Sequence, residues 1–368
     1  MRILFAGGGT AGHINPALAI ADYIKKKKPD TEILFVGTER GLEKSLVPHS
    51  GYDIKFIDVR GFERKLSLGN LKNLFRIIGS VRRAKKIIKA FAPDAVVGTG
   101  GYVSGPVLYA AAKMKIPTVI HETNAFAGMT SKILSRYVDV TAIAFEDGRK
   151  YLPKAKKIVV TGNPIRPELL TISKTDARRK LGVDERPLIL IFGGSLGGRD
   201  FNAAMADFIA LAAADKKLQI HMGTGKNNQF ETVTARLREK INLDENPQIR
   251  VSEYIYDMDV EMNAADLLIT RAGANTVSEL AVVGRPAILI PSPNVTHNHQ
   301  EYNARALEAA GGAAVLLERD LTGAALYELA QKLLRDENEL ISMGKRAKAV
   351  GVTDATEKIY GIIEELIK

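Results

Sequence analysis

The sequence predicts an α/β protein with two doubly wound domains, each built around a parallel β-sheet. Short apolar runs rich in Val, Ile and Leu recur along the chain, and helical stretches lie between most of them. These runs are continuous rather than alternating, which is typical of strands covered on both faces, as in parallel sheets. The series of runs starts twice, each time with a strand that leads into a glycine-rich loop. A chain of 368 residues also exceeds what one hydrophobic core usually serves.

The predicted strands fall into two series, separated by the turn signal Gly162-Asn163-Pro164 and a polar helix around Lys174–Leu181. The first series is expected at Ile3–Ala6, Glu32–Val36, Ile54–Val59, Ala95–Gly98, Pro117–His121, Val138–Ala144 and Ile158–Thr161. The second series is expected at Leu188–Phe192, Leu218–Met222, Ile249–Val251, Leu267–Thr270, Ala287–Pro291 and Ala314–Leu317. The last helix is expected over Asp354–Ile367, where Asp354 and Glu357 are placed to form a capping box.

The composition excludes several classes of protein. Hydrophobic residues make up 46% of the chain and charged residues 26%, which is ordinary for a globular protein. No apolar run approaches the roughly 18 to 20 residues needed to cross a bilayer. The absence of Cys excludes disulfides, a thiolate nucleophile and a Cys-ligated metal, and it fits a cytoplasmic protein.

The net charge of +10 is concentrated in one segment between Arg60 and Ala90, where Glu63 is the only acidic residue. The basic residues of this segment are Arg60, Arg64, Lys65, Lys72, Arg76, Arg82, Arg83, Lys85, Lys86 and Lys89. Such a segment suggests contact with phosphate, nucleic acid or anionic lipid. A charge run on its own is more often a solvated helix face.

Both series of strands open with a glycine-rich loop, as in Rossmann-like units. Gly7-x-Gly9-x-x-Gly12 follows the first strand, and Gly193–Gly198 follows the first strand of the second series. Such loops let backbone N–H groups approach an anion at the start of the next helix. A dinucleotide site would need an acidic residue at the end of the second strand, which instead ends in Gly37-Thr38. A dinucleotide oxidoreductase is therefore disfavoured.

Polar residues follow several strand ends of the first series. His13 directly follows the first glycine loop, and its position favours a functional role over a helix-start residue bonded to backbone. Gly98–Pro106 forms a further glycine loop, so one broad anion site is expected at the carboxyl ends of the strands. His121 ends the next strand, where a functional and a buried histidine are equally expected.

The second series carries candidate sugar-binding residues. The segment Thr270–Glu279 ends a strand and opens a helix, and the carboxylate of Glu279 can accept hydrogen bonds from sugar hydroxyls. His297 and His299 are separated by one residue without an evident third ligand, so sugar recognition is favoured over a metal site. The pair Asp257 and Asp259 could hold a metal ion, but a helix cap is favoured.

These motifs occur together and in order, and they closely resemble the family of bacterial peptidoglycan N-acetylglucosaminyltransferases, which make lipid II from lipid I. The motifs that carry the resemblance are Gly8–His13, Gly100–Pro106, His121-Glu122-x-Asn124, Gly162–Arg166, Gly193–Ser195 and Thr276–Glu279. The resemblance covers essentially the whole chain. It implies a GT-B fold, in which two Rossmann-like domains face a cleft. Residues 1–163 plus 351–368 would form the acceptor- and membrane-binding domain, and residues 164–350 the domain that binds UDP-GlcNAc.

The resemblance also implies the reaction, an inverting transfer of GlcNAc from UDP-GlcNAc to the muramoyl 4-hydroxyl of lipid I, an undecaprenyl diphosphate muropeptide. The substrate-binding residues that it implies are Thr10, Ala11, Gly12, Asn124, Arg166, Ser195, Ile255, Ala274, Asn275, Thr276, Val277, Ser278, Glu279 and Gln300. Ile255 would meet the uracil through its backbone, and Glu279 would bind the ribose. Gln300 would bind GlcNAc hydroxyls, and Arg166 would offset diphosphate charge. Leu196 and His299 stand where glutamine is common in the family.

A single displacement of this kind needs a base near the acceptor hydroxyl, and His13 is the expected base, with Glu122 as the alternative. Neither a protein-bound metal nor a cofactor is expected, because helix dipoles and Arg166 can offset the charge of departing UDP. The protein is expected to act peripherally at the cytoplasmic face of the cell membrane, on an anionic lipid surface and without nucleic acid. The alternatives are a glycosyltransferase that acts on diacylglycerol or another lipid, and a non-catalytic nucleotide-binding or membrane-surface protein.

Overall fold

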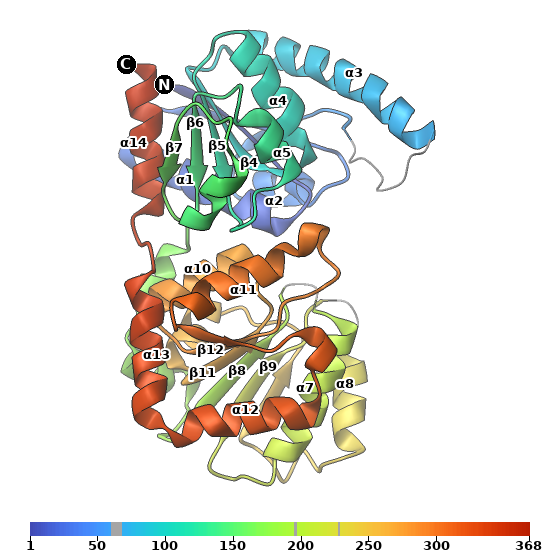
Figure 1. Ribbon diagram of the computed structural model, residues 1–368, viewed down its shortest axis with the longest axis vertical. Helices are drawn as coiled ribbons and strands as arrows, with labels where there is room; N and C mark the ends of the chain where they lie inside the picture. The colour runs from blue at the N-terminus through green and yellow to red at the C-terminus, as the bar shows by residue number, and fades with distance from the viewer. Residues whose placement is uncertain (60–67, 195–196, 227–228) are drawn as a thin grey trace. The chain divides into compact units, whose positions relative to one another are not determined.

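The computed structural model describes residues 1–59, 68–194, 197–226 and 229–368, and for residues 11, 68–75 and 296 it describes the backbone alone. The chain splits into two compact units (Figure 1). Unit 1 consists of Met1–Ile165 and Val352–Lys368, and unit 2 of Arg166–Gly351.

Unit 1 is built on a seven-stranded sheet of order β3-β2-β1-β4-β5-β6-β7, in which neighbouring strands are parallel. Its strands are β1 (Arg2–Gly7), β2 (Glu32–Gly37), β3 (Asp53–Phe56), β4 (Ala95–Gly100), β5 (Thr118–Glu122), β6 (Val140–Ile143) and β7 (Ile158–Val160). Its helices are α1 (Ala11–Lys27), α2 (Glu43–His49), α3 (Leu68–Phe91), α4 (Gly101–Lys113), α5 (Met129–Leu134), the 3-10 helix η1 (Glu146–Tyr151) and α14 (Ala355–Ile367).

Two apolar cores cover the two faces of this sheet. Along β1, Ile3 and Phe5 pack into a core with α1 and α14, whereas Leu4 and Ala6 pack into a core with α3 and α4. Successive side chains of a strand point to opposite faces, so a strand that is covered on both faces needs a continuous apolar run. This packing confirms the α/β prediction that was based on such runs.

Unit 2 is built on a six-stranded sheet of order β10-β9-β8-β11-β12-β13, which is also parallel. Its strands are β8 (Leu188–Phe192), β9 (Gln219–Gly223), β10 (Ile249–Ser252), β11 (Leu267–Thr270), β12 (Ala287–Leu289) and β13 (Ala313–Val315). Its helices are η2 (Pro167–Leu170), α6 (Lys174–Leu181), α7 (Arg199–Ala212), α8 (Gln229–Arg238), α9 (Met258–Ala264), α10 (Ala274–Val283), η3 (Thr296–Asn298), α11 (His299–Ala309), η4 (Glu318–Asp320), α12 (Gly323–Arg335) and α13 (Glu337–Ala349). The largest core of this unit joins α7, α8 and α12 to the sheet.

Several local predictions were wrong. The strands expected over 138–144, 287–291 and 314–317 span Val140–Ile143, Ala287–Leu289 and Ala313–Val315. The strand expected over 54–59 ends at Phe56, because the neighbouring strand β2 ends at Gly37. The N–H of Ile57 donates to the carbonyl oxygen of Gly37 (3.0 Å), and β2 offers no carbonyl beyond it. The capping box of the last helix does not form, since Asp354 makes no side-chain cap hydrogen bond and instead pairs with Lys358 (2.9 Å).

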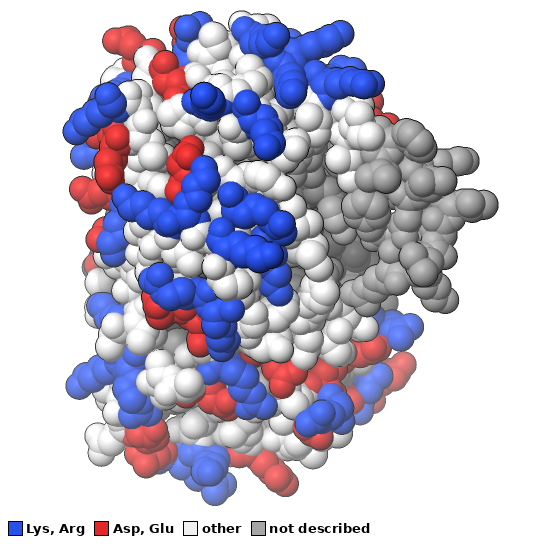
Figure 2. Space-filling view, turned by 45° about the horizontal axis from the view of Figure 1, so that its top comes forward, with Lys and Arg blue, Asp and Glu red and all other residues white. Residues whose placement is uncertain are grey.

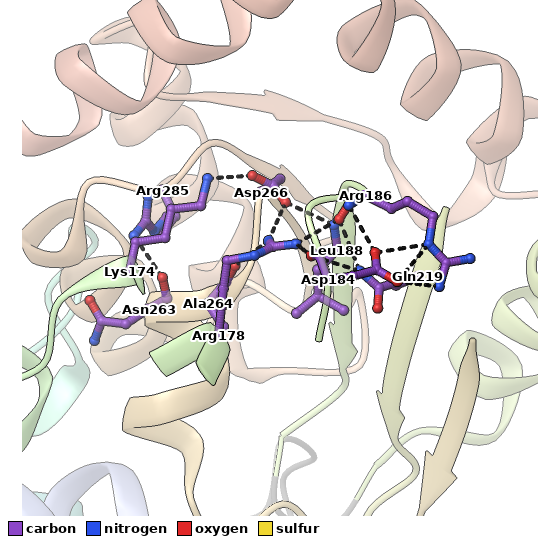
Figure 3. Close-up of polar contacts among 10 residues, drawn as sticks. All are labelled: Lys174, Arg178, Asp184, Arg186, Leu188, Gln219, Asn263, Ala264, Asp266 and Arg285. Carbon is purple, nitrogen blue, oxygen red and sulfur yellow. Dashed lines mark hydrogen bonds and ion pairs between the residues drawn. The ribbon is translucent and has the colours of Figure 1, made fainter. Parts of the chain in front are cut away.

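A polar network lies at the amino ends of β8 and β11 in unit 2 (Figure 3). Asp266, which precedes β11, accepts hydrogen bonds from the N–H of Leu188 (2.8 Å) and from Nη1 of Arg178 (2.9 Å), and it pairs with Lys174. Lys174 and Arg178 both come from α6, so the network anchors this helix to the sheet. Because it lies at the opposite strand ends from the glycine loops, we assign it a structural role.

Candidate active site

The two glycine loops of unit 1 pack closely against each other at the carboxyl ends of β1 and β4. A Cβ atom on Gly101, whose φ is +77°, would lie 2.3 Å from the carbonyl oxygen of Gly8. A Cβ atom on Gly100, whose φ is +106°, would lie 2.5 Å from Nδ1 of His13. The left-handed backbone and the close approach both require glycine here. The sequence from Gly98 to Gly101 therefore builds a surface against which the His13 ring packs.

His13 lies in the first turn of α1 and bonds to β4. Its Nδ1 is 3.0 Å from the carbonyl oxygen of Thr99, and Oγ1 of Thr99 donates to the carbonyl oxygen of His13 (2.6 Å). A carbonyl oxygen only accepts hydrogen bonds, so we assign the proton of the neutral ring to Nδ1. The lone pair of the neutral imidazole then resides on Nε2, the nitrogen that can take up a proton.

His121, by contrast, is fully buried in β5. Its Nε2 is 3.0 Å from the carbonyl oxygen of Gly162, and its Nδ1 is among the buried described atoms without a hydrogen-bond partner. Burial lowers the pKa of His121, although Gly162 and Glu122 act in the opposite direction. The structure therefore favours the buried, neutral histidine over the functional one.

The carboxylate of Glu122 holds the loop that follows β5. Its Oε1 accepts from the backbone N–H of Asn124 (3.0 Å) and from Nδ2 of Asn124 (3.1 Å), and its Oε2 accepts from the N–H of Gly128 (2.8 Å). The side chain is 4% exposed. Three donors thus occupy this carboxylate, and they fix the position of Asn124.

Glu43 is a buried site residue that the sequence analysis missed. It is 0% exposed, and Oε2 of its carboxylate accepts from the N–H of Gly9 in the first glycine loop (2.8 Å). Sequence reasoning considered only an acid at the ribose position after β2. The signal that could have pointed to Glu43 is the pair of glycines Gly37 and Gly41 close before it.

In unit 2, the segment from Ala274 to Glu279 forms the first turns of α10, with Gly273 at the N-cap. Ala274 and Val277 are buried, so the backbone is what they can offer to a ligand. Asn275, Thr276, Ser278 and Glu279 are partly exposed. The N-terminus of a helix with partly exposed polar side chains can bind an anion and hydroxyl groups.

Arg166 and Glu279 form an ion pair, with Nε of Arg166 2.9 Å from Oε1 of Glu279. Burial lowers the pKa of Arg166, but Glu279, Asp259 and Glu168 outweigh burial and raise it. Two residues that the resemblance implies for the donor thus lie in contact with each other.

The remaining predicted substrate-binding residues lie in four separate segments. The side chain of Ile255 packs against the end of β9, where a Cβ atom on Gly223 would lie 3.0 Å from it. Oε1 of Gln300 accepts from the N–H of Ser292 (2.9 Å). Thr10 and Gly12 are exposed, whereas the side chain of Ala11 and the whole of Ser195 and Leu196 lie outside the described residues. Within the described part of the chain, no group of His, Asp and Glu is arranged to hold a metal ion.

Arg271 is a buried cation near the start of α7. It is 9% exposed, pairs with Glu318, and lies over the ring of Phe201 (4.8 Å to the centroid). A Cβ atom on Gly198, the N-cap of α7, would lie 3.4 Å from its Nη2. Burial lowers the pKa of Arg271, and Glu318 opposes this shift.

Comparison with known proteins identifies both units. Residues 3–143 match the N-terminal domain of glycosyltransferase family 28, and residues 188–359 match its C-terminal domain. A protein from Acetivibrio thermocellus is 51% identical over 100% of this chain and 99% of its own length. A protein from Bacillus cytotoxicus is 42% identical over 100% of both chains. Both are UDP-N-acetylglucosamine–N-acetylmuramyl-(pentapeptide) pyrophosphoryl-undecaprenol N-acetylglucosamine transferases.

Solved structures agree with this likeness. The crystal structure of MurG from Acinetobacter baumannii has a TM-score of 0.80 and 30% identity, and the match covers 99% of both chains. A UDP-GlcNAc 2-epimerase from Neisseria meningitidis has a TM-score of 0.68 at 16% identity, covering 99% of this chain and 100% of its own, which shows a shared fold alone. The expected GT-B fold is therefore confirmed. By its full-length identity, the chain belongs to the family of the UDP-N-acetylglucosamine–N-acetylmuramyl-(pentapeptide) pyrophosphoryl-undecaprenol N-acetylglucosamine transferases.

Proposed function

We propose that this protein transfers GlcNAc from UDP-GlcNAc to the muramoyl 4-hydroxyl of lipid I and so forms lipid II for peptidoglycan synthesis. The observation that carries the proposal is the 51% identity to such a transferase over the full length of the chain. The site agrees chemically, because unit 1 presents a histidine whose Nδ1 is 3.0 Å from the carbonyl oxygen of Thr99, and unit 2 presents a helix start lined with partly exposed polar residues.

His13 is the general base in this mechanism. Its Nδ1–H donates to the Thr99 carbonyl, so Nε2 takes the proton of the acceptor hydroxyl as that oxygen attacks the anomeric carbon of GlcNAc. The Thr99 carbonyl oxygen also fixes the orientation of the ring, and it stabilises the imidazolium that forms. Glu122 is less suited to this role, because three loop donors already occupy its carboxylate.

Unit 2 binds the donor and stabilises the leaving UDP. The partial positive charge at the start of α10, together with Arg166, offsets the charge that develops on the diphosphate. Glu279 accepts hydrogen bonds from the ribose hydroxyls, and Gln300 contacts the GlcNAc hydroxyls. The backbone of Ile255 meets the uracil. In unit 1, Thr10, Gly12 and Asn124 contact the substrate.

The test of this proposal is transfer of labelled GlcNAc from UDP-GlcNAc to lipid I by the purified protein. Diacylglycerol and a lipid-free muropeptide are the parallel acceptors. We expect product from lipid I and none from diacylglycerol. Product from diacylglycerol would assign another lipid as the acceptor, and binding of UDP-GlcNAc without turnover would refute catalysis.

We further propose that the protein works peripherally at the cytoplasmic face of the membrane. No helix in the described part of the chain is long and apolar enough to span a bilayer. Lys and Arg side chains gather in groups with few acids over part of the surface (Figure 2). From residue 76 to its end, α3 carries six basic residues and no acidic one: Arg76, Arg82, Arg83, Lys85, Lys86 and Lys89.

The helix α3 leaves its charged face exposed. Its core-facing residues Ala84 and Ile88 pack on the sheet, whereas Ile78 is 45% exposed. The side chains of Leu71, Leu74 and Phe75, which share helical spacing with Ile78, lie outside the described residues. Each Lys or Arg near an anionic leaflet contributes about 1 kcal/mol of attraction.

Vesicle binding tests this surface. Changing Arg64, Lys65, Lys72 and Arg76 together to Gln should reduce co-sedimentation with anionic vesicles and leave UDP affinity intact; the first two residues and the side chain of Lys72 lie outside the described structure. The matched control changes the exposed unit 2 residues Arg179, Lys180, Arg238 and Arg319 to Gln. Equal loss in both variants, or no loss in the first, would move the membrane surface elsewhere.

A further inference from the structure

Glu43 is a fully buried charged group that the proposed reaction does not use. Its Oε2 accepts from the N–H of Gly9 (2.8 Å), and its Oε1 accepts from both the N–H and the hydroxyl of Thr38 (2.8 Å each). The partners therefore come from two loops, the glycine loop after β1 and the loop after β2. An ionised carboxylate satisfies all of these donors at once, and such charge-assisted hydrogen bonds are stronger than neutral ones.

The surrounding chain leaves a space for this carboxylate. A Cβ atom on Gly8 would lie 2.5 Å from Oε1 of Glu43, and one on Gly41 would lie 2.0 Å from its Oε2. A Cβ atom on Gly37 would lie 2.5 Å from Cγ of Glu43. None of these three glycines has the positive φ that would itself require glycine. Glu43 therefore crowds all three positions, and at Gly37 Cδ1 of Ile54 would also lie 2.9 Å from the added Cβ atom.

The glycine loop that Glu43 holds leads directly into the expected base. Gly9 precedes Thr10, whose carbonyl oxygen accepts from the N–H of His13 (3.1 Å). On the other side of the loop, the Gly8 carbonyl oxygen packs against Gly101. The side chain of Thr10 makes no cap hydrogen bond, and the first turn of α1 contains no acidic residue. Glu43 supplies the negative charge at this helix start from another part of the chain.

We propose that Glu43 is a positioning residue for the transfer reaction: its carboxylate acts as a built-in anion that holds the first glycine loop and thereby sets the position of His13. This proposal rests on the proposed function. In a phosphate-binding loop, an N–H such as that of Gly9 binds the ligand. Here the chain itself supplies the anion. The glycine loop is therefore ordered, and His13 is in its reactive position, before the acceptor binds.

The first test is Glu43→Gln. The carboxamide directs its NH₂ group at the donors of either Gly9 or Thr38, so one side of the bridge is lost. A displaced base lowers turnover, and a misplacement of about 1 Å can cost about a hundredfold. We expect kcat for GlcNAc transfer to lipid I to fall about tenfold or more, with the KM for UDP-GlcNAc within about twofold of the parent. The matched control is Glu39→Gln, which changes an exposed acid of the same loop.

The second test is chemical rescue. Glu43→Ala leaves a cavity lined by the N–H groups of Gly9 and Thr38, which formate can enter and chloride can fill less well. We expect formate to restore part of kcat in Glu43→Ala and to leave Glu43→Gln and the parent unchanged. Thermal melting of each variant gives the folded fraction, and kcat is expressed per folded molecule.

The outcomes separate the two proposals. A parent protein without transfer to lipid I would refute the proposed function. With an active parent, a Glu43→Gln variant that keeps kcat within about twofold per folded molecule would overturn the role of Glu43. A parallel change of kcat and of the KM for UDP-GlcNAc would also overturn it, because a positioning role for His13 leaves donor binding intact.

Discussion

The two units begin with the same strand and glycine-loop pattern, yet they bury opposite charges at the carboxyl ends of their strands. Among the described residues, the buried carboxylates are Glu43 and Glu122 in unit 1, and the buried guanidinium is Arg271 in unit 2. In unit 1 both carboxylates accept hydrogen bonds from N–H groups of the unit's own loops. In unit 2 the guanidinium lies beside the start of α7.

We interpret this difference in terms of what each edge would bind. In unit 1 the N–H groups of Gly9 and Gly128 already donate to carboxylates of the chain itself, and His13 offers a base for a hydroxyl. The edge of unit 2 carries a buried cation and two helix starts, which suit a diphosphate. The contrast supports the assignment of the acceptor to unit 1 and of the donor to unit 2.

The largest expected effect concerns the buried cation of unit 2. Arg271→Gln should lower the free energy of unfolding by about 3–5 kcal/mol, because it leaves the carboxylate of Glu318, whose side chain is only 15% exposed, without its ion-pair partner. Arg305→Gln breaks a more exposed ion pair with Glu308 and should cost less than about 1 kcal/mol. Urea unfolding measures both. If the two variants lose the same free energy of unfolding, the Arg271–Glu318 pair contributes no more to stability than a surface ion pair.

The next effect concerns the base of unit 1. His13→Ala should lower kcat about a hundredfold, the usual scale for a lost general base, with little change in UDP-GlcNAc affinity. His13→Asn is the sharper variant, because its amide can still donate to the Thr99 carbonyl but no longer offers a basic nitrogen. We expect it to be as inactive as His13→Ala. Recovery of activity in His13→Asn would show that His13 only shapes the loop.

Donor binding in unit 2 should depend on the pair of Arg166 and Glu279. Glu279→Ala should weaken UDP binding by about 1–3 kcal/mol, because the ribose loses its acceptor. The effect should be much smaller for 2′-deoxy-UDP in calorimetric titrations. Because the two side chains are in contact, Arg166→Gln and Glu279→Ala should be non-additive by about 0.5 kcal/mol or more. Strict additivity, or unchanged UDP affinity in Glu279→Ala, would remove Glu279 from the ribose site.

The smallest effect concerns the buried His121 of unit 1 and pH. Since burial lowers its pKa in the folded state, the unfolded chain binds a proton that the folded chain does not, once the pH falls below about 6.5. This histidine therefore reduces stability as the pH falls from 7, by at most about 1.4 kcal/mol per pH unit. His121→Gln keeps a donor toward Gly162 and should flatten this dependence in melting experiments between pH 7 and 5. An unchanged slope would show that other groups cause it.

The strands and loops of both units could be predicted from the sequence because their signals are local. A buried parallel strand shows itself as a continuous apolar run, such as Leu188–Phe192, and a glycine loop is visible directly after it. The segment Thr270–Glu279 was predicted to end a strand and open a helix in the same way, and β11 does end at Thr270 and α10 does begin at Ala274. Neighbours in sequence are enough for these features.

The side-chain partners were decided only by the tertiary structure. The hydrogen bond between His13 and Thr99 joins residues 86 positions apart in the sequence. The hydrogen bond between Glu43 and Gly9 joins residues 34 positions apart. The first arises because β1 lies next to β4 in the sheet, and the second because the loop after β2 folds back onto the loop after β1. An apolar run specifies that a strand is buried, but it does not specify which strand ends beside it. The charge that a loop amide meets therefore depends on strand order, and strand order is a property of the whole sheet.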